Sequence, residues 1–129
     1  GRTHACRKLR KTMSQQEYRR AKRKQVAERI DVTDTLTESV VGLIGNISES
    51  GMMLLANADT MEDALFQMSF TLADAGGNRR EVSVGTHQLW SEPAYQPGQF
   101  WTGFRFIDIS PEDLAVLRIW IDLPGSQYV

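Results

Sequence analysis

The sequence has one cysteine, two histidines and four prolines, and it has no long hydrophobic run. A lone cysteine, Cys6, cannot form an internal disulfide bond, and no group of His and Cys has the spacing of metal ligands. No apolar stretch approaches the roughly 18 residues that span a membrane, and no signal-peptide pattern begins the chain. A nucleophile–base pair, a glycine-rich phosphate loop and a carboxylate dyad are also missing. We therefore expect a cytoplasmic protein that has no metal or resident cofactor and is not an enzyme.

The charges that are present are distributed unevenly. The chain has 129 residues, of which 41% are hydrophobic and 24% charged, as in an ordinary globular domain. Residues 1–24 contain ten Lys and Arg and one acid, a net charge of +9, while the rest of the chain has a net charge of −10. A basic segment on an acidic body indicates a polyanionic partner. We expect residues 1–17 to be a flexible basic tail or linker, 18–123 a single domain, and 124–129 a C-terminal tail.

Hydrophobic residues alternate with polar ones along most of the chain, which is typical of half-buried strands. The clearest case is 64–72, where Phe66, Met68, Phe70 and Leu72 share one face. Asp74–Asn78 has the composition of a hairpin turn. Short strands separated by frequent turns predict an antiparallel barrel. The expected strands are 26–32, 40–44, 52–55, 64–72, 80–90 and 100–109.

One helix is predicted, directly after the last strand. Ser110 is a favourable N-cap, and Pro111 fits the first helical position. The helix presents an apolar stripe and ends before Pro124. The stripe consists of Leu114, Leu117, Trp120 and Ile121. The expected fold is therefore all-β with a terminal helix that caps the barrel.

An arginine cluster lies at the end of the basic segment. Arg19, Arg20 and Arg23 occur within five residues, and Arg19 and Arg23 have the spacing Arg-x-x-x-Arg. The planar guanidinium pairs with phosphate, or with the O6/N7 edge of guanine, through two parallel hydrogen bonds. Three such side chains can grip a small dinucleotide. Considered alone, the cluster is also typical of a solvated basic tail, or of a patch that binds nucleic acid or acidic lipid.

A polar turn follows about 23 residues after the arginines. Asn46, Ser48 and Gly51 form the pattern Asn-x-Ser-x-x-Gly between two predicted strands. Asn and Ser side chains at a turn bond either local backbone or a ligand, and glycine permits a close approach. The pattern is also compatible with an ordinary tight turn.

Together, in this order and at this separation, the two motifs resemble the PilZ domain family of bacterial cyclic di-GMP receptors. The segment 103–113, Gly-Phe-Arg-Phe-Ile-Asp-Ile-Ser-Pro-Glu-Asp, is similar to that family's last strand running into its helix. The resemblance spans roughly residues 18–122. It implies a six-stranded antiparallel barrel capped by a C-terminal helix, and a receptor acting in processes such as motility or biofilm formation.

The resemblance also implies roles for six residues. Arg19 and Arg23 would hold phosphate and guanine with help from Arg20, Asn46 and Ser48 would bond the base or phosphate, and Gly51 would give the ligand room. Asn46 stands where many members have aspartate, so the turn lacks that negative charge. Ligand binding would order the segment that carries Arg19, Arg20 and Arg23, the arginine arm, on the barrel. This would change the surface offered to a protein partner or a fused domain.

Two other functions remain open from the sequence. One is a PilZ-like protein-interaction module that binds no ligand. The other is a nucleic-acid-binding domain that uses the basic arm, which the acidic body disfavours because it supplies no second basic face. Trp90 and Trp101 either stack on a purine or pack at the barrel rim.

Overall fold

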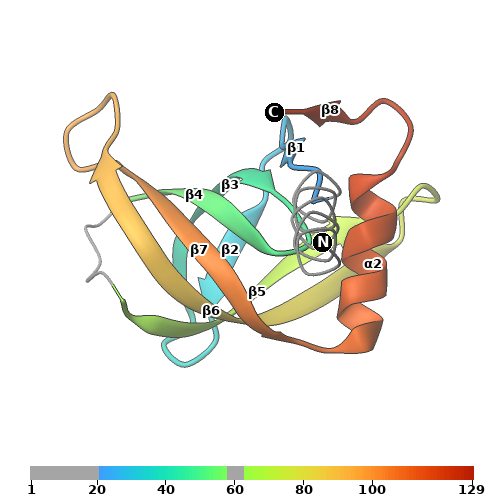
Figure 1. Ribbon diagram of the computed structural model, residues 1–129, viewed down its shortest axis with the longest axis horizontal. Helices are drawn as coiled ribbons and strands as arrows, with labels where there is room; N and C mark the ends of the chain where they lie inside the picture. The colour runs from blue at the N-terminus through green and yellow to red at the C-terminus, as the bar shows by residue number, and fades with distance from the viewer. Residues whose placement is uncertain (1–20, 58–62) are drawn as a thin grey trace, which may run out of the picture.

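The computed structural model describes residues 21–57 and 63–129. Within them, eight strands and one helix follow one another along the chain (Figure 1). The helix is α2 (Pro111–Ile121). The strands are β1 (Lys24–Gln25), β2 (Asp31–Asp34), β3 (Ser39–Ile47), β4 (Gly51–Ala56), β5 (Leu65–Ala73), β6 (Arg79–Pro93), β7 (Phe100–Ile109) and β8 (Gln127–Tyr128).

Six of the strands close into an antiparallel barrel. Their order is β2-β5-β6-β7-β4-β3, and the additional pairing of β2 with β3 joins the two ends. β1 pairs with the far end of β3, and β8 pairs with β1, so these two short strands extend the sheet beyond the barrel. The predicted six-stranded barrel with a terminal helix is confirmed.

The alternation seen in the sequence places one face of each strand inside the barrel. In β5 the side chains of Met68, Phe70 and Leu72 are buried, and Phe66 packs against them half-buried, as predicted. The same core receives the helix stripe through Leu117, Trp120 and Ile121, whereas Leu114 is only half-buried. Burial of these side chains provides most of the stabilisation of such a fold.

Helix α2 begins as the sequence predicts. The Ser110 side chain accepts a hydrogen bond of 3.1 Å from the backbone N–H of Asp113, and Pro111 occupies the first turn. The helix ends at Ile121, three residues before Pro124. It packs beside β5 and β6 at one end of the barrel (Figure 1). Its C-terminal end thereby lies close to β1 and β8.

The prediction of a continuous strand over 26–32 is wrong. β1 pairs Gln25 with Asn46, and β2 pairs Asp31 with Leu43 of the same strand β3. Only Ile44 and Gly45 of β3 are left to face residues 26–30. Because five residues cannot pair with two, residues 26–30 form a loop between β1 and β2. The alternating pattern still has a physical basis, because Ile30 is buried in the core.

The hairpin turn between β5 and β6 depends on Asp74. Its Oδ1 accepts hydrogen bonds from the backbone N–H groups of Gly76 (2.9 Å) and Asn78 (2.8 Å), and Gly77 has a φ of 82°. These bonds favour the charged carboxylate, so they lower the pKa of Asp74, the bond from Asn78 most strongly.

Replacing Asp74 by alanine is expected to lower the denaturant midpoint of unfolding near neutral pH. Because the folded-state pKa is depressed, this stabilisation is present above the unfolded-state pKa and is lost as the pH falls through the folded-state value. The difference between parent and variant should therefore shrink in acid. Urea unfolding of the parent and the variant, at neutral and at acidic pH, tests this. Asp31→Ala, which removes an exposed carboxylate elsewhere, is the control. Equal midpoints at neutral pH would contradict the assigned role.

Candidate functional site

The structure brings together the described members of the two sequence motifs. Arg23 Nη1 donates a hydrogen bond of 2.8 Å to Asn46 Oδ1, across 23 positions of sequence. Arg19 and Arg20 lie outside the described residues, as does the whole tail expected over 1–17. The contact follows from strand pairing, because β1 begins one residue after Arg23 and pairs Gln25 with Asn46.

Ser48 is buried, with 1% of its surface exposed, and its polar groups are bonded within the turn. Its backbone N–H donates to Gly51 O (2.8 Å), and its Oγ accepts from Ser50 N (3.2 Å). The Oγ atoms of Ser48 and Ser50 are 3.0 Å apart and share a hydrogen bond. The first role of Ser48 is therefore to shape the turn, and both Ser48 and the exposed Ser50 line a neighbouring groove.

Gly51 is required by a close approach between strands. It pairs with Arg105 of β7, and a Cβ placed on Gly51 would lie 2.3 Å from the carbonyl oxygen of Phe104. No side chain fits there. The resemblance implied that this glycine gives a ligand room, which stays a prediction, whereas the structure shows that it lets β4 and β7 meet.

Two hollows adjoin Arg23. A groove of about 610 Å³ lies between the arm and the turn, and a second hollow of about 310 Å³ lies against β4, β6 and β7. The groove is lined by Ala21, Lys22, Arg23, Ser48, Ser50, Tyr128 and Val129. The second hollow is lined by Arg23, Asn46, Met52, Met53, Leu89, Trp90, Gly103 and Phe104. Arg23 therefore lines both spaces.

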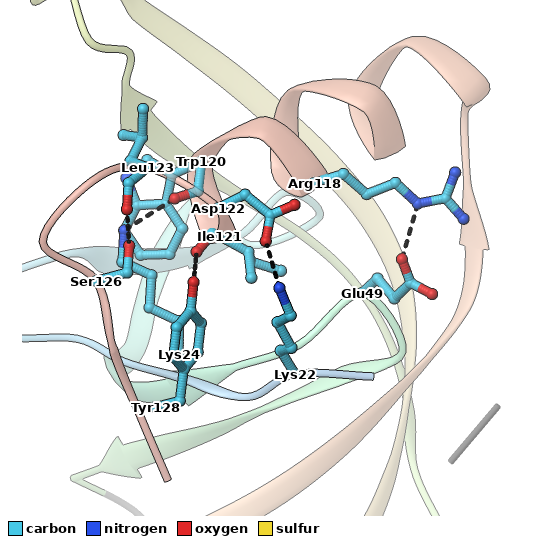
Figure 2. Close-up of polar contacts among 10 residues, drawn as sticks. All are labelled: Lys22, Lys24, Glu49, Arg118, Trp120, Ile121, Asp122, Leu123, Ser126 and Tyr128. Carbon is cyan, nitrogen blue, oxygen red and sulfur yellow. Dashed lines mark hydrogen bonds and ion pairs between the residues drawn. The ribbon is translucent and has the colours of Figure 1, made fainter. Parts of the chain in front are cut away.

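Lys24 anchors the described start of the arm to the C-terminal end of α2. Its Nζ donates to Trp120 O (2.8 Å) and lies 3.7 Å from the centroid of the Trp120 ring (Figure 2). A cation at a helix C-terminus is stabilised by the free carbonyl groups and the helix dipole. Burial lowers the pKa of Lys24, and the negative charge of Glu28 acts in the opposite direction. The chain is thus anchored to α2 one residue after Arg23.

Strand β8 borders the groove, although the sequence predicts only a C-terminal tail over 124–129. Val129 N donates to Arg23 O (2.9 Å), and Tyr128 Oη donates to Ile121 O (2.8 Å). Both residues line the groove. A strand of two residues has no measurable period, so no sequence pattern indicated that the segment 124–129 contributes to the site.

Trp90 packs against the barrel, and its stacking on a purine stays a prediction. Its indole lies against Gly103, where an added Cβ would be 2.2 Å from Nε1, so it packs on the barrel surface. It also remains 38% exposed and lines the second hollow beside Asn46. Trp101 is half-buried against Gly45, and Trp120 belongs to the core.

Within residues 21–57 and 63–129, no three side chains of His, Cys, Asp or Glu are grouped so as to hold a metal ion. His87 pairs instead with Asp63, at 3.2 Å. In the same part of the chain, no helix has the length and apolar character needed to cross a membrane.

Comparisons with known proteins agree with the fold. A protein-family model, the PilZ domain, matches residues 17–122. The Bacillus subtilis inhibitor of motility MotI/DgrA superposes with a TM-score of 0.61 at 12% identity, over 74% of this chain and 46% of that one. The PilZ domain of YcgR from Escherichia coli, solved with c-di-GMP, superposes with a TM-score of 0.53 at 15% identity, over 74% of this chain and 82% of that one. No curated protein matches the chain.

Proposed function

Since the chain belongs to the PilZ domain family, we propose that it is a receptor for cyclic di-GMP and not an enzyme. The observation that supports this most is the hydrogen bond between Arg23 and Asn46, which joins the arginine arm to the polar turn beside a groove of about 610 Å³. The YcgR domain, which has the same fold, was solved with this nucleotide. Cyclic di-GMP is the ligand, and no further cofactor is proposed.

The proposed site consists of the arm and the turn. Arg23 exchanges its bond to Asn46 for a phosphate oxygen or the Hoogsteen edge of guanine, and Arg19 and Arg20 join it from the arm. The released Asn46 amide then bonds the base. Ser50 and the turn shaped by Ser48 face the phosphates. Gly51 keeps the turn close to β7.

Binding would order the arm on the barrel, and this ordering would be the signal. A segment that becomes fixed only with ligand changes the surface seen by a partner. The output is then a protein partner or a fused domain, acting in the cytoplasm, where a second-messenger receptor is expected. Motility is the process we would examine first, because the similar MotI/DgrA is an inhibitor of motility. Biofilm formation is the second.

The direct test is calorimetric titration of cyclic di-GMP into the whole chain at moderate salt. We expect saturable binding of low-micromolar affinity or tighter, and a stoichiometry that distinguishes one nucleotide from a pair. Linear GpG dinucleotide is the control, because it has the same bases without the closed phosphate ring. Absence of heat from a chain with a folded circular dichroism spectrum would reject the receptor and favour the interaction module.

The nucleic-acid alternative is tested in the same series. Tracking of phosphates by the arm predicts affinity that falls steeply with salt and tolerates many sequences. We expect no saturable binding of duplex or single-stranded oligonucleotides at the same salt concentration. Strong, salt-sensitive oligonucleotide binding without cyclic di-GMP binding would replace the proposed function.

A further inference from the structure

Two ion pairs link helix α2 and its C-cap residue, Asp122, to residues within the two motifs. Arg118 Nε is 2.7 Å from Glu49 Oε2 in the polar turn, and Lys22 Nζ is 3.3 Å from Asp122 Oδ1 (Figure 2). These four side chains and Ile121 line a polar hollow of about 360 Å³. Lys22 also lines the groove of the proposed site, so the hollow and the groove adjoin.

The Arg118 guanidinium has hydrogen-bond donors that are not used by the described residues. It contacts Glu49 through Nε alone, and in the part of the chain that the structure describes its Nη1 and Nη2 atoms make no hydrogen bond or ion pair. Figure 2 shows the two terminal nitrogens directed away from Glu49. The side chain is 57% exposed, which leaves it free to change rotamer. A guanidinium in this condition can take an anion without breaking a buried network.

The negative charge of Glu49 disfavours an anionic ligand nearby unless a cation offsets it. Glu49 lies between Ser48 and Ser50, which line the groove, so its carboxylate would repel a phosphodiester bound there. An exposed ion pair of this kind contributes little to stability and is readily exchanged. Arginine and phosphate form stronger, two-point hydrogen bonds.

We propose that Arg118 is a further phosphate-binding residue of the cyclic di-GMP site, contributed by helix α2 and belonging to neither sequence motif. The proposal rests on the proposed function. On binding, the Nη1 and Nη2 groups of Arg118 turn from solvent to a non-bridging phosphate oxygen. The hydrogen bond from Arg118 Nε to Glu49 is either broken or kept beside this new contact. The ligand thereby contacts α2 directly, as well as the arm and the turn.

The test is a double-mutant cycle on the whole chain, with cyclic di-GMP as the titrant. The four proteins are the parent, Arg118→Ala, Glu49→Gln and the double variant. Direct phosphate binding predicts that Arg118→Ala weakens affinity roughly tenfold or more in both backgrounds. Glu49→Gln should bind at least as tightly as the parent. Arg118→Lys, which keeps the charge without the two-point geometry, should be intermediate.

The opposing result is clear. If Arg118 only neutralises Glu49, then Arg118→Ala weakens binding in the parent background and has no effect once Glu49 is glutamine. That outcome, or no effect in either background, overturns the assignment of Arg118 and leaves the receptor intact. A parent chain that binds no cyclic di-GMP rejects the proposed function itself, and this inference with it. Circular dichroism of each variant tests its fold, which we expect to be kept because neither side chain belongs to the apolar core.

Discussion

Replacing Arg23 by alanine is expected to weaken cyclic di-GMP binding by about a hundredfold or more, with the barrel still folded. Charge-assisted hydrogen bonds contribute roughly 1.5–3 kcal/mol each, and loss of a two-point contact removes two of them. The Arg23–Asn46 bond that is lost in the unliganded protein is partly buried but lies outside the apolar core. The measurement is the calorimetric titration described above, repeated on the variant.

Two further variants separate charge from geometry at this position. Arg23→Lys keeps the positive charge and loses the planar fork, so its affinity should fall between those of the parent and Arg23→Ala. Arg29→Ala removes one exposed arginine that pairs only weakly with Asp31, at 3.3 Å, and lines a different hollow. It should bind like the parent. If Arg23→Ala also binds like the parent, the site has been placed wrongly.

Replacing Gly51 by alanine is expected to destabilise the protein by about 3 kcal/mol or more, at the upper end of what overpacking costs. The added Cβ would lie 2.3 Å from the backbone oxygen of Phe104, and a backbone atom can retreat only if β4 and β7 separate. Urea unfolding followed by circular dichroism measures the effect. Ligand binding should be lost together with the fold of the turn.

Gly76→Ala is the matched control for that experiment. Gly76 has no positive φ, and its Cβ would meet only side-chain atoms of Asn78 and Asp74, at 3.4 and 3.5 Å. Its stability should stay within about 1 kcal/mol of the parent. A Gly51→Ala variant as stable as Gly76→Ala would show that the close contact between β4 and β7 is not required. The glycine of the motif would then act on the ligand alone.

The sequence could predict the barrel because its information is local. Hydrophobic and polar residues alternate along each strand, so the position of a residue such as Met68 in this pattern predicts which face of the sheet it occupies. The helix start is equally local, since Ser110 and Pro111 act on the turn that follows them. The two motifs could be recognised for a similar reason, because each consists of a few residues at fixed, short spacings along the chain.

The tertiary structure alone decided how the proposed site is enclosed. Whether 26–30 continues a strand depends on how many residues of β3 lie opposite, which no pattern in the segment itself records. Lys24 is buried on Trp120, and β8 borders the groove, because the end of α2 returns the chain to β1. Arg118 and Glu49 are 69 positions apart and meet for the same reason. Local periodicity determined the elements of this protein, and long-range pairing determined which side chains share its site.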